Sequence, residues 1–103
     1  MYGVIYVIIN LLNGMRYVGQ TRQRLKKRMS QHASANSYID NAIRHYGWDN
    51  FTVEVIEECA TPEQLNERER FWIAYFNCNH PNGYNLTDGG NLKIFANVLS
   101  WRG

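Results

Sequence analysis

The chain has 103 residues, a formal net charge of +2 and 45% hydrophobic residues. This length favours a single domain, and the hydrophobic fraction excludes a disordered chain. The apolar run Val4–Ile9 is too short to cross a bilayer and lacks the basic flank and cleavage site of a signal peptide, so we expect a cytoplasmic protein without membrane contact. Cys59 and Cys78 are too far apart for a zinc knuckle, which favours two reduced thiols.

Basic charge is concentrated at the start of the chain. Residues 1–39 contain no Asp or Glu, so all nine acidic residues lie from Asp40 onward. The basic side chains of this first part are Arg16, Arg22, Arg24, Lys26, Lys27 and Arg28. Such a region on a near-neutral domain is typical of phosphate binding, but it is also compatible with a solvated helix face.

The first predicted unit is a β-hairpin. The segment Gly3–Asn10 is rich in β-branched and aromatic residues, which predicts a strand. Asn13 and Gly14 form a hairpin turn signal, and Met15–Gln20 is the expected return strand.

This hairpin predicts that Tyr6 and Tyr17 lie close together. Residues paired across an antiparallel ladder share a face, so a loop of even length puts both phenols on one side and Gly19 opposite Tyr6. A glycine there would let a substrate approach, and the two phenols could bracket a reacting water. The alternative is a pair of aromatic side chains that pack against a helix.

Two helices are predicted next, one from about Leu25 to Ala33 and one from about Tyr38 to Tyr46, ended by Gly47. Arg28 and His32 are four residues apart and therefore share a face of the first helix. A guanidinium at the edge of the core can hold a phosphate oxygen by two hydrogen bonds and stabilise charge at phosphorus. His32 is either catalytic or a buried histidine with satisfied hydrogen bonds. The candidates for contacts to a DNA backbone are Arg22, Arg24, Lys26 and Lys27.

The second half of the chain predicts a third strand at Phe51–Glu57 and a long helix that ends near Phe76. Thr61–Gln64 is a capping-box sequence with proline at the first helical position. A short last strand is expected within Asn82–Leu86. The order ββααβα plus this strand predicts an α/β (α+β) fold with a small, mostly antiparallel sheet flanked by helices. We expect one domain over residues 1–90 and a tail or linker over 91–103.

Glu69 falls on the apolar stripe of the long helix, four residues after Leu65 and three before Trp72. A carboxylate that faces a core costs several kcal/mol unless another group compensates its charge. The residue therefore predicts either a bound divalent cation or a structural ion pair with an arginine.

Taken together, these residues resemble the GIY-YIG nuclease family. The segments that carry the resemblance are Val4-Ile5-Tyr6, Tyr17-Val18-Gly19, Arg28 with His32, Trp48–Phe51, Glu67–Ile73 and Gly83–Leu86. They cover about residues 3–90 and are most similar to the catalytic domains of phage and intron-encoded homing endonucleases. Val4 departs from the family glycine, and Gly3 stands one place earlier. Some homing enzymes carry a second histidine between the first two helices, and this sequence has no clear equivalent.

The resemblance implies a three-stranded sheet flanked by helices and an active site made by Tyr6, Tyr17, Arg28, His32, Glu69 and Asn85. Glu69 would bind one divalent ion, Mg²⁺ or Mn²⁺, and one tyrosine would deprotonate the attacking water. Arg28 would steady the phosphate and Asn85 would support the cleft.

The implied function is metal-dependent hydrolysis of DNA phosphodiester bonds without a small-molecule cofactor. The enzyme would act as a monomer or as a transient dimer on DNA, and either as a fragment of a longer homing enzyme or as a small enzyme of low specificity. One alternative is a non-catalytic DNA-binding module of the same fold. Another is a structural protein in which the tyrosines and Glu69 only pack.

Overall fold

The computed structural model describes residues 1–32 and 37–86, so the predicted helix end at Ala33, the domain boundary at residue 90 and the tail lie outside the described residues. Within them the helices and strands follow one another in the predicted order up to the long helix. They are β1 (Gly3–Asn10), β2 (Arg16–Thr21), α1 (Leu25–His32), α2 (Tyr38–Tyr46), the 3-10 helix η1 (Trp48–Asn50), β3 (Phe51–Cys59) and α3 (Pro62–Phe76). The α+β prediction is confirmed.

The sheet has the strand order β2-β1-β3, with both pairs antiparallel. Gly14 takes a positive φ of 75° in the turn and donates its N–H to the carbonyl of Asn10 at 2.8 Å. Tyr6 pairs with Gly19 and Ile8 pairs with Tyr17, so the hairpin register is confirmed.

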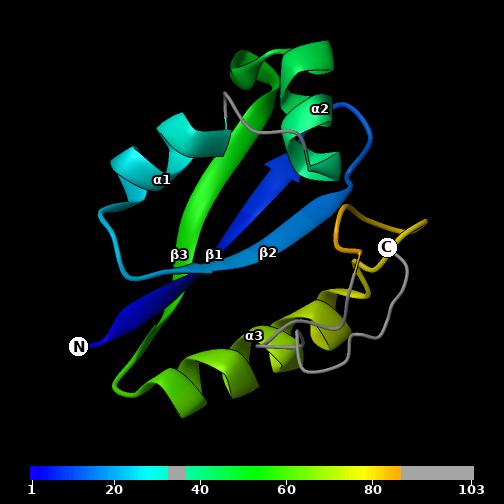
Figure 1. Cartoon of the computed structure of the whole chain (residues 1–103). Coiled ribbons are helices and arrows are strands. Elements are labelled where there is room, and N and C mark those ends of the chain that lie inside the picture. The colour runs from blue at the N-terminus through cyan, green and yellow to red at the C-terminus, as the bar shows by residue number, and fades with distance from the viewer. Residues whose placement is uncertain (33–36, 87–103) are drawn as a thin grey trace.

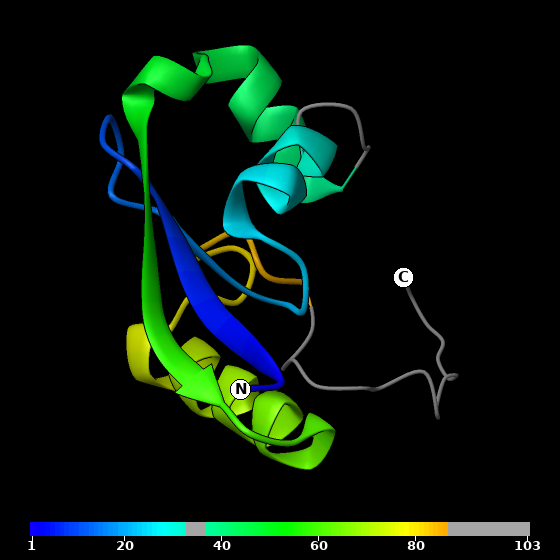
Figure 2. The same ribbon diagram turned by 90° about the vertical axis from the view of Figure 1, so that its left-hand side faces the viewer.

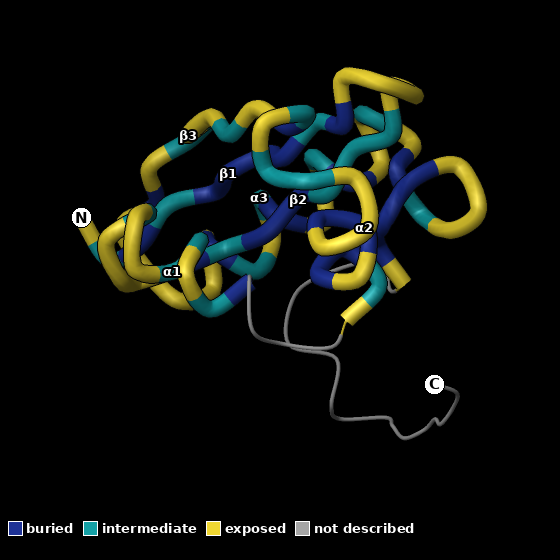
Figure 3. Tube along the Cα trace, turned by 90° about the horizontal axis from the view of Figure 1, so that it is seen from above, coloured by how far each residue is buried: buried dark blue, intermediate teal, exposed yellow. Residues whose placement is uncertain are grey.

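Helices cover both faces of the sheet (Figures 1 and 2): α1 and α2 lie on one face and α3 lies on the other. Because side chains alternate along a strand, β1 supplies Tyr6 and Ile8 to the core beside α2, and Ile5 and Val7 to the core beside α3. The centre of the molecule along β1 is accordingly buried, as Figure 3 shows. Tyr6 reaches the α1 side for this reason.

A β-bulge interrupts the alternation of side chains along β3, which regular strand geometry would continue from Phe51 through Val53 and Val55. Ile5 pairs with Glu57 and Tyr6 pairs with Val55, which leaves Ile56 as an extra residue in β3. The bulge turns Ile56 toward the core beside α3, while Val55 is 43% exposed. After the bulge the strand continues to Cys59, beyond the predicted end at Glu57.

The predicted last strand is wrong. Residues 79–86 form turns with an isolated bridge between Asn79 and Asn85. The free edge of β2 is instead met by one backbone bond, from the N–H of Tyr84 to the carbonyl of Arg16 at 2.9 Å, and by one side chain. Asn85 accepts from the N–H of Val18 and donates to its carbonyl, both at 2.9 Å. Beyond the single backbone bond, an amide side chain thus takes the place that a fourth strand would occupy.

The helix α3 begins at Pro62, where it was predicted. Thr61 caps it by accepting from the N–H of Gln64 at 3.0 Å, but the Gln64 side chain accepts from Ala60 rather than from Thr61. None of the helices in the described ranges has the length and apolar character needed to span a membrane. Cys59 and Cys78 are both free and buried.

Candidate active site

The two phenols predicted by the hairpin register lie together on one face. The ring centroids of Tyr6 and Tyr17 are 6.2 Å apart, and Tyr6 is fully buried whereas Tyr17 is half-buried. Gly19 makes room for both rings. A Cβ at this position would lie 2.5 Å from the hydroxyl oxygen of Tyr6 and 2.8 Å from Cε2 of Tyr17. The hairpin therefore requires glycine at the point where the phenols meet.

A chain of hydrogen bonds leads inward from Tyr6 through His32 to Asp40. The Tyr6 hydroxyl lies 2.7 Å from Nε2 of His32, and Nδ1 of His32 lies 2.6 Å from Oδ1 of Asp40. All three residues are buried, with His32 and Asp40 each 2% exposed. The arrangement fits a neutral ring that donates a hydrogen bond from Nδ1 to the carboxylate and accepts one from the Tyr6 hydroxyl at Nε2.

Burial is the main influence on the protonation states of the tyrosines and of His32 in this hydrogen-bonded series. It is the main cause that raises the pKa of Tyr6 to about 12; Glu69 contributes to this rise and the Arg28 guanidinium opposes it. Burial also raises the pKa of Tyr17, with Tyr6 and Glu69 acting in the same direction. Burial lowers the pKa of His32, so the ring is neutral at pH 7.

The carboxylate of Asp40 keeps its charge although it is enclosed. Burial alone would raise the pKa of Asp40, but hydrogen bonds from Ser37 and His32 outweigh burial and leave that pKa lowered. The second oxygen, Oδ2, accepts from the backbone N–H of Ser37 at 3.0 Å and from its hydroxyl at 2.6 Å. Asp40 thus joins the end of α1 to the start of α2.

Glu69 is buried on α3, as its position on the apolar stripe predicted, with 9% of the residue exposed. Its Oε1 accepts from the side-chain amide of Gln20 on β2 at 2.8 Å, and the same amide donates to Asn66 at 2.9 Å. Gln20 therefore ties the acid to the hairpin that carries the phenols. Glu69 also raises the pKa of both tyrosines, after the larger effect of burial, so the acid lies within electrostatic range of the phenols.

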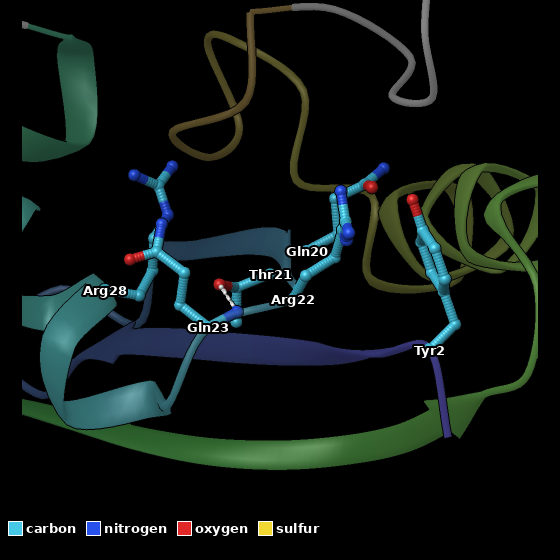
Figure 4. Close-up of a pocket in the computed structure, with 6 residues that line it drawn as sticks. All are labelled: Tyr2, Gln20, Thr21, Arg22, Gln23 and Arg28. Atoms are coloured by element: carbon cyan, nitrogen blue, oxygen red, sulfur yellow. Dashed lines mark hydrogen bonds between the residues drawn. The ribbon is translucent and has the colours of Figure 1, made fainter.

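A polar groove runs along the outer edge of β2. Its first part, of about 590 Å³, is lined by Tyr2, Gln20, Thr21, Arg22, Gln23 and Arg28 (Figure 4). An adjoining part of about 460 Å³ is lined by Tyr2, Gln20, Arg22, Pro62, Leu65, Asn66 and Glu69. Because the two parts share three residues, the groove connects Arg28 on α1 with Glu69 on α3.

The predicted basic contacts divide into two groups. Arg28 is half-buried at the groove, as expected for the core edge, and Arg22 lies in the groove with its guanidinium 4.7 Å from the centroid of the Tyr2 ring. Arg24, Lys26 and Lys27 are exposed and do not line the described groove. Their contact with DNA remains a prediction.

Asn85 faces the backbone of Val18 and does not line the groove. It fixes the strand between Tyr17 and Gly19, which matches a supporting role. Sequence reasoning missed Gln20 and Asp40. Asp40 stands three residues after Ser37, which is an ordinary signal for the start of a helix and does not indicate the further contact of Asp40 with His32. The sequence gives no signal for the contact of Gln20 with Glu69.

The fold and this groove define a small α+β catalytic domain of the GIY-YIG type. The chain belongs to the GIY-YIG catalytic domain family, which matches residues 2–85. It is 29% identical to segE of Enterobacteria phage T4, a protein whose name describes it as an endonuclease, over 90 residues. The match covers 87% of this chain and 43% of segE, so the chain spans less than half of that relative.

Solved structures of the catalytic domain of the intron endonuclease I-TevI have the same fold. A mutant form matches with a TM-score of 0.72 and 30% identity, covering 86% of this chain and 97% of that domain. A second structure of this domain matches with a TM-score of 0.69 and 30% identity, covering 82% and 98%.

Proposed function

We propose that this chain is a DNA endonuclease that hydrolyses phosphodiester bonds with the help of one divalent ion, Mg²⁺ or Mn²⁺, held by Glu69. The observation that carries the proposal is the groove along β2, which is lined by the guanidinium of Arg28 and by the buried acid Glu69. The phenols of Tyr6 and Tyr17 do not line it but belong to the same hairpin. The names of segE and I-TevI, which both contain the word endonuclease, support the same reaction. The reaction would take place in the cytoplasm, where both thiols stay reduced.

The donor chemistry around Glu69 suits a hard cation. Carboxylate and amide oxygens are the ligands that Mg²⁺ prefers, and Glu69 lies beside the amides of Gln20 and Asn66. Residues 1–32 and 37–86 contain no group of three or more His, Cys, Asp or Glu that could hold a metal. The ion would therefore complete its coordination with water and phosphate, as Mg²⁺ commonly does.

The raised pKa values of the two phenols also favour a cation at this place. After burial, Glu69 is among the groups that raise the pKa of both tyrosines, so the acid alone keeps the phenols protonated. A divalent ion at Glu69 would reverse this effect and supply positive charge to the phosphate and to the leaving oxygen.

Tyr17 is the less buried of the two tyrosines as a whole residue, so the proposal gives it the first proton transfer. In the proposed reaction the attacking water forms a bond to phosphorus and gives its proton to Tyr17. Tyr17 passes a proton to Tyr6, and Tyr6 passes its own to Nε2 of His32. Arg28 binds a non-bridging oxygen, and the P–O bond to the leaving oxygen breaks as that oxygen takes up a proton from a solvent water.

The test is nicking of supercoiled plasmid DNA in Mg²⁺ by the whole chain and by Glu69→Gln. The amide keeps the size and the acceptor for Gln20 but removes the charge, so we expect a rate loss of roughly 100-fold or more. Glu67→Gln is the matched control, since Glu67 is exposed on the same helix and should change nothing.

Full nicking by folded Glu69→Gln would refute the proposed role of this acid. Salt-sensitive DNA binding by the wild-type chain without any nicking would instead support the non-catalytic DNA-binding module. Neither binding nor nicking would leave a structural protein as the better account.

A further inference from the structure

We propose that Asp40 is a positioning residue of the reaction and acts through His32. It holds the imidazole in the one tautomer whose Nε2 can take the proton of Tyr6. This inference rests on the proposed function, and it concerns a residue outside the groove and outside the set that the family resemblance implied.

The geometry leaves the ring little freedom. His32 is the last residue of α1 and Asp40 lies in the first turn of α2, so the contact of 2.6 Å joins two helices above the sheet. A carboxylate accepts hydrogen bonds and donates none, which requires a hydrogen on Nδ1 of His32. In the neutral ring, Nε2 is then an acceptor that lies 2.7 Å from the Tyr6 hydroxyl.

The other tautomer would reverse the direction of the hydrogen bond between His32 and Tyr6. With the hydrogen on Nε2, the ring would donate to the Tyr6 oxygen and could not accept its proton. The proton released by the attacking water would then have no acceptor behind the phenols. When Tyr6 does transfer its proton, its O–H bond breaks, an Nε2–H bond forms, and the carboxylate of Asp40 balances the positive charge on the ring.

Both oxygens of Asp40 are engaged, which makes the carboxylate hard to replace. Oδ1 accepts from His32 while Oδ2 accepts from the N–H and the hydroxyl of Ser37. An asparagine has only one acceptor oxygen, so its amide group must face either Nδ1 of His32 or the N–H of Ser37. Asp40→Asn should therefore populate the tautomer with hydrogen on Nε2.

A helix cap alone would be a simpler role for Asp40, and Ser37→Ala separates the two roles. This change removes the hydroxyl bond to Oδ2 but keeps the backbone bond to Oδ2 and the bond from His32 to Oδ1. If Asp40 only caps α2, both variants lose stability and neither changes the ring of His32.

The experiment records the tautomer of His32 by long-range ¹H–¹⁵N NMR at pH 8, together with the single-turnover rate of plasmid nicking in Mg²⁺. We expect the Nδ1–H tautomer in the wild-type protein and in Ser37→Ala. Asp40→Asn should show the Nε2–H tautomer and a nicking rate lower by on the order of 100-fold, the usual contribution of a general base. Ser37→Ala should nick at close to the wild-type rate.

An Nε2–H ring in the wild-type protein would overturn the inference, and this result needs no variant to fold. A changed tautomer in folded Asp40→Asn with an unchanged nicking rate would overturn it as well. A wild-type protein that has the Nδ1–H ring but never nicks DNA would refute the proposed nuclease function and the catalytic part of this inference together. The NMR result would then still support the hold of Asp40 on His32.

Discussion

Replacing Gly19 by alanine tests whether the close approach of the two phenols matters for cleavage. The added Cβ would lie 2.5 Å from both Cζ and the hydroxyl oxygen of Tyr6 and 2.8 Å from Cε2 of Tyr17. Ordinary carbon contacts begin near 3.5 Å, so the Tyr6 ring must move by roughly 1 Å. The hydroxyl would then lose its alignment with His32, and the overpacking should cost about 1–3 kcal/mol of stability.

A displacement of this size can lower a catalytic rate by roughly 100-fold, and we expect such a loss of plasmid nicking in Gly19→Ala. Gly14→Ala is the control, because its Cβ meets nothing within 4 Å and only its positive φ of 75° is strained. That strain costs about 1–2 kcal/mol, similar to the first variant, but it leaves the phenols in place. Normal nicking by folded Gly19→Ala would refute the reasoning.

Two further predictions concern stability in urea unfolding. Asn85→Ala should lower the free energy of unfolding by about 2–4 kcal/mol, because it leaves the buried N–H and carbonyl of Val18 without their side-chain partner; an unchanged value would contradict the role of Asn85 at the strand edge. Burial lowers the pKa of His32, so the unfolded chain binds this proton more readily, and the stability present above about pH 6.5 is lost as the pH falls through the lowered pKa. The decrease in the free energy of unfolding between pH 7 and pH 5 should be smaller in His32→Gln than in the wild-type protein. An equal decrease in both would contradict the contribution of His32.

Local rules were sufficient to predict the hairpin. The turn at Asn13 and Gly14 sets the register, and the register places Tyr6 and Tyr17 on one face without any knowledge of the rest of the chain. Helical spacing likewise identified Glu69 as a buried acid and Arg28 as a residue at the core edge.

The remaining features depend on contacts that sequence periodicity does not record. The bulge at Ile56 arises from the pairing of β3 with β1, so a pattern read along one strand cannot show where the alternation changes. The edge of β2 is paired by the side chain of Asn85 beside a single backbone bond from Tyr84, which no strand pattern would indicate. Asp40 and Gln20 reach their partners across different elements of the fold, and only the tertiary structure brings them together.

The proposed mechanism requires Glu69 and the hairpin to act on one phosphate through one ion in the groove. Crystals of the protein grown with Mn²⁺ would test this directly, because the ion can be located by its anomalous scattering. We predict one Mn²⁺ in the groove along β2, bonded to a carboxylate oxygen of Glu69, and no such ion in Glu69→Gln. An ion bound elsewhere, or a groove without Mn²⁺ at saturating concentration, would contradict the account.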